Sequence, residues 1–253
     1  CKMPVKITVG PPVLTINKGE TFMITDERGE IDPLRAQGVF SDDTRYLSRY
    51  RLWINEKQWD RVSSAVVSYD AARLYLVNPA LEYHIGRVGL STGPIFTTSV
   101  AGSTVALSLE RFVGETIRES FEVTNFGQDK INIVLGIELE CDYSDIFEVR
   151  QGELRQRENI ATYWDAKRGE LVTTYEDRGF VRRFVYKVAG AKEGLSYANG
   201  HLNFPVHLDP GESWRVCGFM FLEENRQRAP RRRRCTWLSD EGYHMEKLQK
   251  RWV

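Results

Sequence analysis

The sequence is poor in the residues that usually form metal centres and disulfide frameworks. It has four cysteines and four histidines in 253 residues, and neither type is clustered. No C-x-x-C, H-x-H or H-E-x-x-H spacing occurs, so no metal site is predicted. Sparse cysteines are typical of reduced thiols, and we therefore expect a cytoplasmic protein. The residues are Cys1, Cys141, Cys217 and Cys235, and His84, His201, His207 and His244.

The sequence also lacks long apolar runs and nucleotide-binding motifs. No run approaches the roughly 18 apolar residues of a membrane helix, so no membrane partner is expected. Neither G-x-G-x-x-G nor the phosphate-binding loop G-x-x-x-x-G-K-[ST] is present, and no nucleotide cofactor is predicted. The 42% hydrophobic and 28% charged residues indicate a soluble globular protein, long enough to bury a sizeable core.

Charge is balanced over the whole chain but not along it. The formal net charge is zero, yet residues 226–253 carry nine Lys or Arg against three Asp or Glu, a net of +6. Residues 1–225 therefore carry a net of −6. Six arginines lie between Arg226 and Arg234. A nucleic-acid contact through this cluster is the weaker hypothesis, because no aromatic residues are interleaved for base stacking and the rest of the chain is acidic.

Short alternating runs predict strands along most of the chain. From Ile131 to Leu139, apolar residues occupy one parity, as on a strand with one buried face. Ile117 to Val123 alternates similarly, and Asn125 to Asp129 supplies turn residues between the two. We expect these two runs to pair as an antiparallel hairpin. Comparable runs are Val5–Val9, Val13–Ile16, Thr21–Ile24, Tyr46–Ile54 (with Arg49 and Arg51 on the more exposed parity), Val62–Ser68, Arg73–Val77, Tyr83–Val88, Ile95–Val100, Val105–Phe112, Ile160–Trp164, Leu171–Tyr175, Phe180–Val188, Leu202–Leu208 and Trp214–Leu222.

These strands predict an all-β fold with two further segments at its end. Many short strands between turn signals, with no helical period before about residue 238, favour a large antiparallel β-sandwich over residues 1–222. Residues 223–238 are expected to form an Arg-rich linker. Residues 239–253 are expected to form a terminal helix, because Met245, Leu248 and Trp252 share one helical face. This apolar stripe predicts a further domain against which the helix packs.

Two motifs in this order carry a family resemblance. The first is F-S-D-D-T-R-Y-L-S at Phe40–Ser48, and the second is C-D-Y-S-D-I-F-E-V-R at Cys141–Arg150. Together they resemble the N-terminal domain of bacterial glycogen-debranching-type enzymes, the amylo-α-1,6-glucosidase-like proteins. The resemblance extends from about Ile24 to Phe221. It implies a two-sheet β-sandwich, the supersandwich, beside a helical (α/α) domain that cleaves α-1,6-glucosidic branches.

The candidate site residues lie in these two motifs. Glycoside hydrolysis needs two facing carboxyl groups, but the resemblance implies that the catalytic acids belong to the helical domain, so none is assigned here. Charged and aromatic loop residues suit a surface that meets the catalytic domain or borders its glucan cleft. The alternative is an internal network, with Asp43 paired to Arg45 and Asp145 or Glu148 paired to Arg150. The candidates are Asp43, Arg45, Tyr46, Asp142, Asp145, Phe147, Glu148 and Arg150.

Two functions from different classes follow. The first is a non-catalytic N-terminal domain that braces the helical catalytic domain and shapes its α-glucan cleft, without a cofactor. The second is a free-standing carbohydrate-binding or protein-interaction module. Sugar stacking on exposed aromatic rings would favour the second, although most aromatics of a sandwich belong to its core. The aromatic candidates are Trp59, Tyr163, Trp164 and Tyr175.

Overall fold

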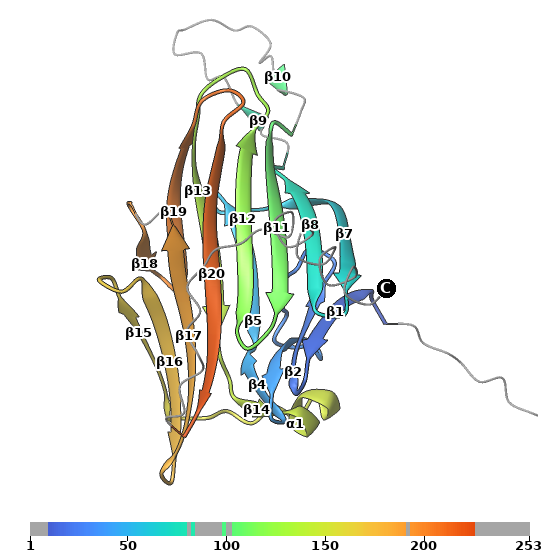
Figure 1. The fold of residues 1–253 in the computed structure, drawn as a ribbon, viewed down its shortest axis with the longest axis vertical. Coiled ribbons are helices and arrows are strands. Elements are labelled where there is room, and N and C mark those ends of the chain that lie inside the picture. The colour runs from blue at the N-terminus through green and yellow to red at the C-terminus, as the bar shows by residue number, and fades with distance from the viewer. Residues whose placement is uncertain (1–9, 80–81, 84–97, 100–102, 191–192, 226–253) are drawn as a thin grey trace, which may run out of the picture.

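The computed structural model describes residues 10–79, 82–83, 98–99, 103–190 and 193–225. Over these residues the chain forms antiparallel strands and one short helix, which confirms the predicted all-β class (Figure 1). The helix is α1 (Ile146–Gln151). The strands are β1 (Val13–Lys18), β2 (Thr21–Asp26), β3 (Gly38–Ser41), β4 (Thr44–Leu47), β5 (Arg49–Ile54), β6 (Lys57–Gln58), β7 (Asp60–Ser68), β8 (Ala71–Val77), β9 (Glu82–Tyr83), β10 (Thr98–Ser99), β11 (Val105–Val113), β12 (Ile117–Asn125), β13 (Ile131–Glu140), β14 (Ser144–Asp145), β15 (Ile160–Asp165), β16 (Glu170–Asp177), β17 (Phe180–Gly190), β18 (Ser196–Ala198), β19 (His201–Leu208) and β20 (Ser213–Glu224).

The strands form a sandwich around one core. An eight-stranded sheet, ordered β15-β16-β17-β20-β12-β11-β8-β7, makes one layer. Two five-stranded sheets, β18-β19-β13-β5-β6 and β1-β2-β3-β4-β14, contact it from the other side. An isolated bridge between Ile31 and Tyr50 joins these two smaller sheets. Apolar side chains from all three sheets belong to one buried cluster, so the second layer of the sandwich is divided in two.

The hairpin expected from Ile117–Val123 and Ile131–Leu139 is wrong. β12 pairs with β11 and β20 in the eight-stranded sheet, whereas β13 pairs with β19 and β5 in the opposite layer. The turn at Asn125–Asp129 therefore carries the chain across the sandwich, and the Asn125 side chain closes it through bonds to the Asp129 carbonyl and the Gly127 N–H. Both strands do have a buried face. The alternation predicted each face correctly, but it holds no information on whether two such faces share a sheet or oppose each other.

Several details of the chain qualify the sequence-based boundaries. The last strand, β20, ends at Glu224, two residues beyond the expected sandwich boundary. Residues 226–253, which hold most of the predicted linker and all of the predicted terminal helix, lie outside the described residues, as do Val5–Val9 and most of the runs between Tyr83 and Val100. α1 has only six residues, and no helix in the described ranges is long and apolar enough to span a membrane.

The cysteines depart in part from the expected reduced state. Cys141 is free, and burial raises the pKa of its thiol far above the ordinary value. Cys217 is fully buried and is disulfide-bonded. The prediction of reduced thiols is therefore wrong at Cys217.

Candidate functional site

The two motifs of the family resemblance lie side by side in the fold. β14 pairs with β4, with Ser144 opposite Arg45 and Asp145 opposite Thr44. The Ile146 N–H, at the start of α1, donates to the Asp43 carbonyl at 2.8 Å. Residues 42–46 and 142–151 thus form one structural unit at the α1 end of the sandwich (Figure 1). We call these residues the α1 corner.

A buried ion pair holds the two motifs together. The Arg45 side chain is completely buried, and its Nε lies 3.2 Å from both carboxylate oxygens of Asp142. One terminal nitrogen of the guanidinium also donates to Asp142, and the other donates to the carbonyls of Arg35 and Gln37, at 3.2 Å each. Arg45 therefore ties β4, the segment before β14 and the loop before β3 into one arrangement. Such a charge-assisted, two-point contact fixes geometry as well as supplying energy.

Close packing at Gly38 leaves room for this arginine. Gly38 has a positive φ of 153°, and a Cβ at this position would lie 2.6 Å from the Arg45 Cδ and 2.8 Å from the Leu47 carbonyl oxygen. A side chain cannot be placed here unless Arg45 or the backbone moves.

Tyr143 connects the α1 corner to the eight-stranded sheet. Its hydroxyl donates to the Thr173 carbonyl at 2.6 Å and accepts from the Phe184 N–H at 3.1 Å. Its ring stacks on Tyr175 and meets Tyr46 edge-on, each with ring centroids 5.6 Å apart. Burial raises the pKa of Tyr46 to about 12 and raises the pKa of Tyr143 further above its usual range. Both phenols therefore remain neutral, and the geometry assigns them structural contacts rather than proton transfer.

The acidic residues of the second motif cap and brace α1, a helix that the sequence did not predict. The Asp145 carboxylate accepts from the Phe147 N–H at 2.7 Å, and the Glu148 carboxylate accepts from the Asp145 N–H at 3.3 Å, completing a capping box. Glu148 also pairs with Arg157 at 3.0 Å. Only one and a half turns long, α1 is too short to give a periodic sequence signal, although the D-x-x-E spacing is the signature of this cap.

The expected ion pairs differ from those in the structure. Asp43 is the second residue of the two-residue turn between β3 and β4, with a positive φ of 58°, and its side chain is exposed. Arg45 points inward to Asp142 instead of pairing with Asp43. Arg150 is exposed, and no ion pair joins it to Asp145 or Glu148. Glu148 is two residues away, and residues two apart do not face each other on a helix, whereas the Asp145 carboxylate caps the N-terminus of α1. The sequence identified the right residue types but assigned each charge to its nearest neighbour.

The outward side of the α1 corner carries apolar side chains. Phe147 is 61% exposed on α1, although both ends of this helix are fixed by hydrogen bonds. Leu154, just after the helix, is 39% exposed, and Leu34, next to the Arg35 carbonyl that binds Arg45, is 85% exposed. Of the eight predicted site residues, the structure thus buries Arg45 and Tyr46, uses Asp142, Asp145 and Glu148 as internal partners, and leaves Asp43, Phe147 and Arg150 on the surface.

The other sequence candidates do not form a second site. Trp59 is buried and Tyr175 is stacked on Tyr143, whereas Tyr163 is 51% exposed and Trp164 packs at the edge of the core. Among the described residues no group of three His, Cys, Asp or Glu side chains is placed to hold a metal ion. The spacing G-x-S-x-G occurs once, at Gly89–Gly93, outside the described residues, and no catalytic serine is inferred from it.

A second buried charge network lies between the layers. Arg111 and Glu119, on neighbouring strands β11 and β12, pair at 2.7 Å and are almost completely buried. The hydroxyls of Tyr50 and Tyr186 donate to the same Glu119 oxygen at 3.2 and 3.0 Å. In the sequence, Glu119 shares the parity of the apolar residues Ile117 and Phe121, which face the core. A carboxylate on a core-facing position needs a buried partner, so this position was the available sign of an internal ion pair. Four buried polar groups from both layers fix how the layers meet.

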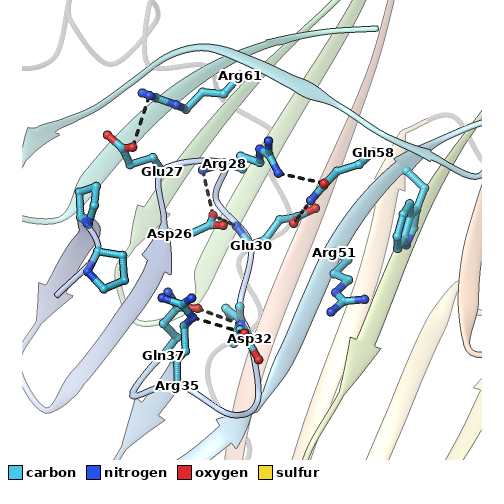
Figure 2. Close-up of a pocket in the computed structure, with 14 residues that line it drawn as sticks. Asp26, Glu27, Arg28, Glu30, Asp32, Arg35, Gln37, Arg51, Gln58 and Arg61 are labelled. Atoms are coloured by element: carbon cyan, nitrogen blue, oxygen red, sulfur yellow. Dashed lines mark hydrogen bonds and ion pairs between the residues drawn. The ribbon is translucent and has the colours of Figure 1, made fainter. Parts of the chain in front are cut away.

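A charged pocket of about 600 Å³ opens beside β5 (Figure 2). Its rim carries four carboxylates and four guanidinium groups, so it has no net charge. Figure 2 shows Glu30 bonded to Gln58, whereas Arg51 makes no interaction with the residues drawn. Burial raises the pKa of Glu30 above its ordinary value. The charged lining residues are Asp26, Glu27, Glu30, Asp32, Arg28, Arg35, Arg51 and Arg61.

Comparison with solved structures gives one alignment that supports the class of fold. A galactose mutarotase-like protein from Lactobacillus casei aligns with a TM-score of 0.50 and 7% identity, over 84% of this chain and 100% of that one. A putative aldose 1-epimerase from Escherichia coli K12 aligns with a TM-score of 0.44 and 12% identity, over 85% of this chain and 99% of that one. A putative kojibiose phosphorylase from the human microbiome aligns with a TM-score of 0.45 and 8% identity, over 85% of this chain and 26% of that one. The first supports the β-sandwich fold, and the identities are too low to carry any activity across.

The family follows from the sequence. The model of the N-terminal domain of some glycogen debranching enzymes matches residues 16–218, which include both motifs of the α1 corner. The chain therefore belongs to this family of N-terminal domains, and the predicted resemblance is confirmed. Comparison with curated proteins gives no match.

Proposed function

We propose that this chain is the non-catalytic N-terminal domain of a debranching-type glycoside hydrolase. In this proposal it braces a helical (α/α) catalytic domain of the same parent protein, which acts on α-1,6-glucosidic bonds, and it shapes the edge of the α-glucan cleft. Family membership supports the class of parent protein. The single observation that carries the docking role is Phe147, a large apolar side chain that is 61% exposed on a helix held rigid at both ends.

The acids of the α1 corner suit structure better than catalysis. Asp142 is paired with Arg45, Asp145 caps α1, and Glu148 is shared between the cap and Arg157. Hydrolysis of a glycosidic bond needs two carboxyl groups about 5–10 Å apart, facing a sugar between them. Carboxylates committed to a cap and to ion pairs are not free for that chemistry, and so we place the catalytic acids in the other domain.

The α1 corner also has the make-up of a docking surface. Interface cores are enriched in aromatic residues and arginine, and truncation of a buried aromatic anchor commonly costs 1 kcal/mol or more. α1 offers this pairing, because Phe147 and Arg150 lie about one turn apart on it and both are exposed. A preformed corner binds with little loss of conformational entropy, because its loops are already fixed by Arg45.

The test is Phe147→Ala in the parent protein. We expect unchanged unfolding of the isolated chain, within about 0.5 kcal/mol, because the ring is exposed. In the parent we expect easier separation of the two domains, measured by limited proteolysis, and slower glucose release from branched dextrin. Phe126→Ala is the matched control: Phe126 is 71% exposed and directly follows β12, at the end away from α1 (Figure 1). If both variants behave alike, the docking surface is misplaced.

The cytoplasmic location predicted from the sparse cysteines belongs with this proposal. A parent that acts on glycogen would meet its substrate in that compartment. The disulfide at Cys217 weakens the cysteine argument, so the location depends on the proposed substrate alone.

A further inference from the structure

Trp53 lies between two hollows on the outer face of the sheet β18-β19-β13-β5-β6. It lines the charged pocket of Figure 2, and it also lines a second hollow of about 690 Å³. Both volumes are within the roughly 300–1,000 Å³ that is usual for small-molecule sites. Trp53 lines both hollows, and together they make one candidate site.

Strand register shows how the sheet forms this site. Trp53 lies opposite Gly136, which lies opposite Asn203, in one row across β5, β13 and β19. A Cβ at Gly136 would be only 3.3 Å from the Trp53 Cβ and 3.7 Å from the Asn203 Oδ1, so the missing side chain leaves space beside the indole. In the next row, Arg51 and His201 flank Glu138, and the His201 ring lies 6.4 Å from that of Trp53.

Polar groups in this site have unused hydrogen-bonding capacity. The Trp53 Nε1–H is buried and has no hydrogen-bond partner in the described part of the chain. The Arg51 guanidinium forms no hydrogen bond or ion pair with any described residue, since Glu138 pairs with Arg49 instead. Buried donors without partners are uncommon in folded proteins, and a ligand or ordered water is the usual explanation. The site therefore offers donors beside an aromatic surface.

The chemistry of the site selects its ligand. The four acids and four arginines of the first pocket cancel, so neither a strongly anionic nor a strongly cationic ligand is favoured. A nucleic acid would need a net positive surface. A saccharide fits these features, because one face of a pyranose ring is apolar and packs on an indole, while its hydroxyls accept from guanidinium and amide donors. Space on both sides of Trp53 suits more than one sugar unit.

We propose that a neutral oligosaccharide binds along this outer face, with one sugar ring on Trp53 and its neighbours in the two hollows. The second hollow lies on a different sheet from the α1 corner, whereas the charged pocket is lined in part by Asp26 of β2 and by Gln37, whose carbonyl binds Arg45. The choice of an α-1,4-linked glucan as the ligand rests on the proposed function, whereas the oligosaccharide class rests on the site alone.

The test is titration of the 253-residue chain with maltoheptaose, followed by calorimetry and by tryptophan fluorescence. We expect saturable binding that Trp53→Ala weakens at least 10-fold. Gly136→Val is the second variant. Its branched side chain suits strand conformation and would fill the part of the second hollow beside Trp53. It should weaken binding similarly while thermal unfolding confirms the fold. Tyr69→Ala, which removes a 67% exposed aromatic ring from another surface, should leave binding unchanged.

The outcomes separate this inference from the proposed function. The chain could bind cellohexaose or xylohexaose but not maltoheptaose, and both variants could abolish that binding. This result would support the site and contradict the proposal that the parent protein acts on an α-glucan. Maltoheptaose binding with the same affinity in the two variants would overturn the site. No saturable binding of any of the three oligosaccharides would overturn it as well, whatever the result for Phe147.

Discussion

Replacing Asp142 with asparagine keeps the shape of the side chain and removes its charge. Arg45 is then a guanidinium with no exposed surface and no anion beside it. Breaking a buried ion pair by removing one partner typically costs about 3–5 kcal/mol, because the remaining charge stays in a poorly solvated place. We therefore expect Asp142→Asn to reduce the free energy of unfolding substantially.

The structure places the effect below the top of that range. The Asp142 side chain is 26% exposed, so water already screens part of the pair. Arg45 keeps its bonds to the Arg35 and Gln37 carbonyls, and an asparagine oxygen still accepts one hydrogen bond. After these discounts the expected loss is about 2–3 kcal/mol.

Urea unfolding followed by circular dichroism measures this loss. The matched control is Asp209→Asn, because Asp209 pairs with Lys130 at 2.8 Å but the two side chains are 52% and 78% exposed. Such a surface pair contributes below about 1 kcal/mol. The double variant Arg45→Met, Asp142→Asn should lose less than the sum of its two single variants, because no unpaired charge remains buried.

A stability loss for Asp142→Asn no larger than that for Asp209→Asn would contradict this expectation. In that case the burial of Arg45 would not matter energetically, and the α1 corner would be held by backbone pairing between β4 and β14 alone. Strict additivity of the two single variants would lead to the same conclusion.

Two further predictions concern Glu30 and Gly38. Burial raises the pKa of Glu30 in the folded chain above its ordinary 4.5, so the folded chain binds the carboxyl proton more tightly than the unfolded chain does. The contribution of Glu30 to stability therefore falls as the pH rises from the unfolded-state pKa through the folded-state pKa. As the pH rises from about 4.5 to 7, the free energy of unfolding of Glu30→Gln should therefore fall less than that of the unchanged chain, as measured by urea unfolding. An equal fall in the two proteins would contradict a raised pKa at Glu30. Gly38→Ala should cost about 1–3 kcal/mol from the clash with Arg45, measured by urea unfolding. Gly152→Ala, where φ is +73° but no atom lies within 4 Å, should cost less, and the reverse order would refute the packing argument.

Local patterns were enough to predict the fold class. Strand alternation depends on which side of each strand meets the core, and this information is present in each short run. Tyr46 to Ile54, for example, was expected to face inward on one parity with Arg49 and Arg51 outward. The structure confirms this alternation from Arg49 to Ile54, whereas Tyr46 and Leu47 belong to a separate strand, β4, that is buried on both parities. What could not be derived is the pairing of strands, because β12 and β13 carry the same alternation whether they share a sheet or face each other.

The candidate site was predicted as a place but not as a set of contacts. The two motifs are about 100 residues apart in the sequence, and family resemblance alone linked them. The Arg45–Asp142 pair spans that separation, whereas reasoning from the sequence favoured near neighbours such as Asp43. Trp53 was not predicted, because the alternation of its run identifies the core-facing parity and Trp53 lies on the other one. Its position on the same outward parity as Arg49 and Arg51 was the available signal.

The internal network and the proposed docking surface of the α1 corner are not alternatives. A six-residue helix has no stability of its own, since isolated helices shorter than about 12 residues are marginal in water. α1 keeps its position only because Asp145 and Glu148 cap it and because Arg45 fixes the strand on which it begins. Phe147 is therefore exposed in a defined orientation as a result of charges buried behind it. Loss of the Arg45–Asp142 pair would act on docking indirectly, by releasing the helix, whereas loss of Phe147 would act on docking alone.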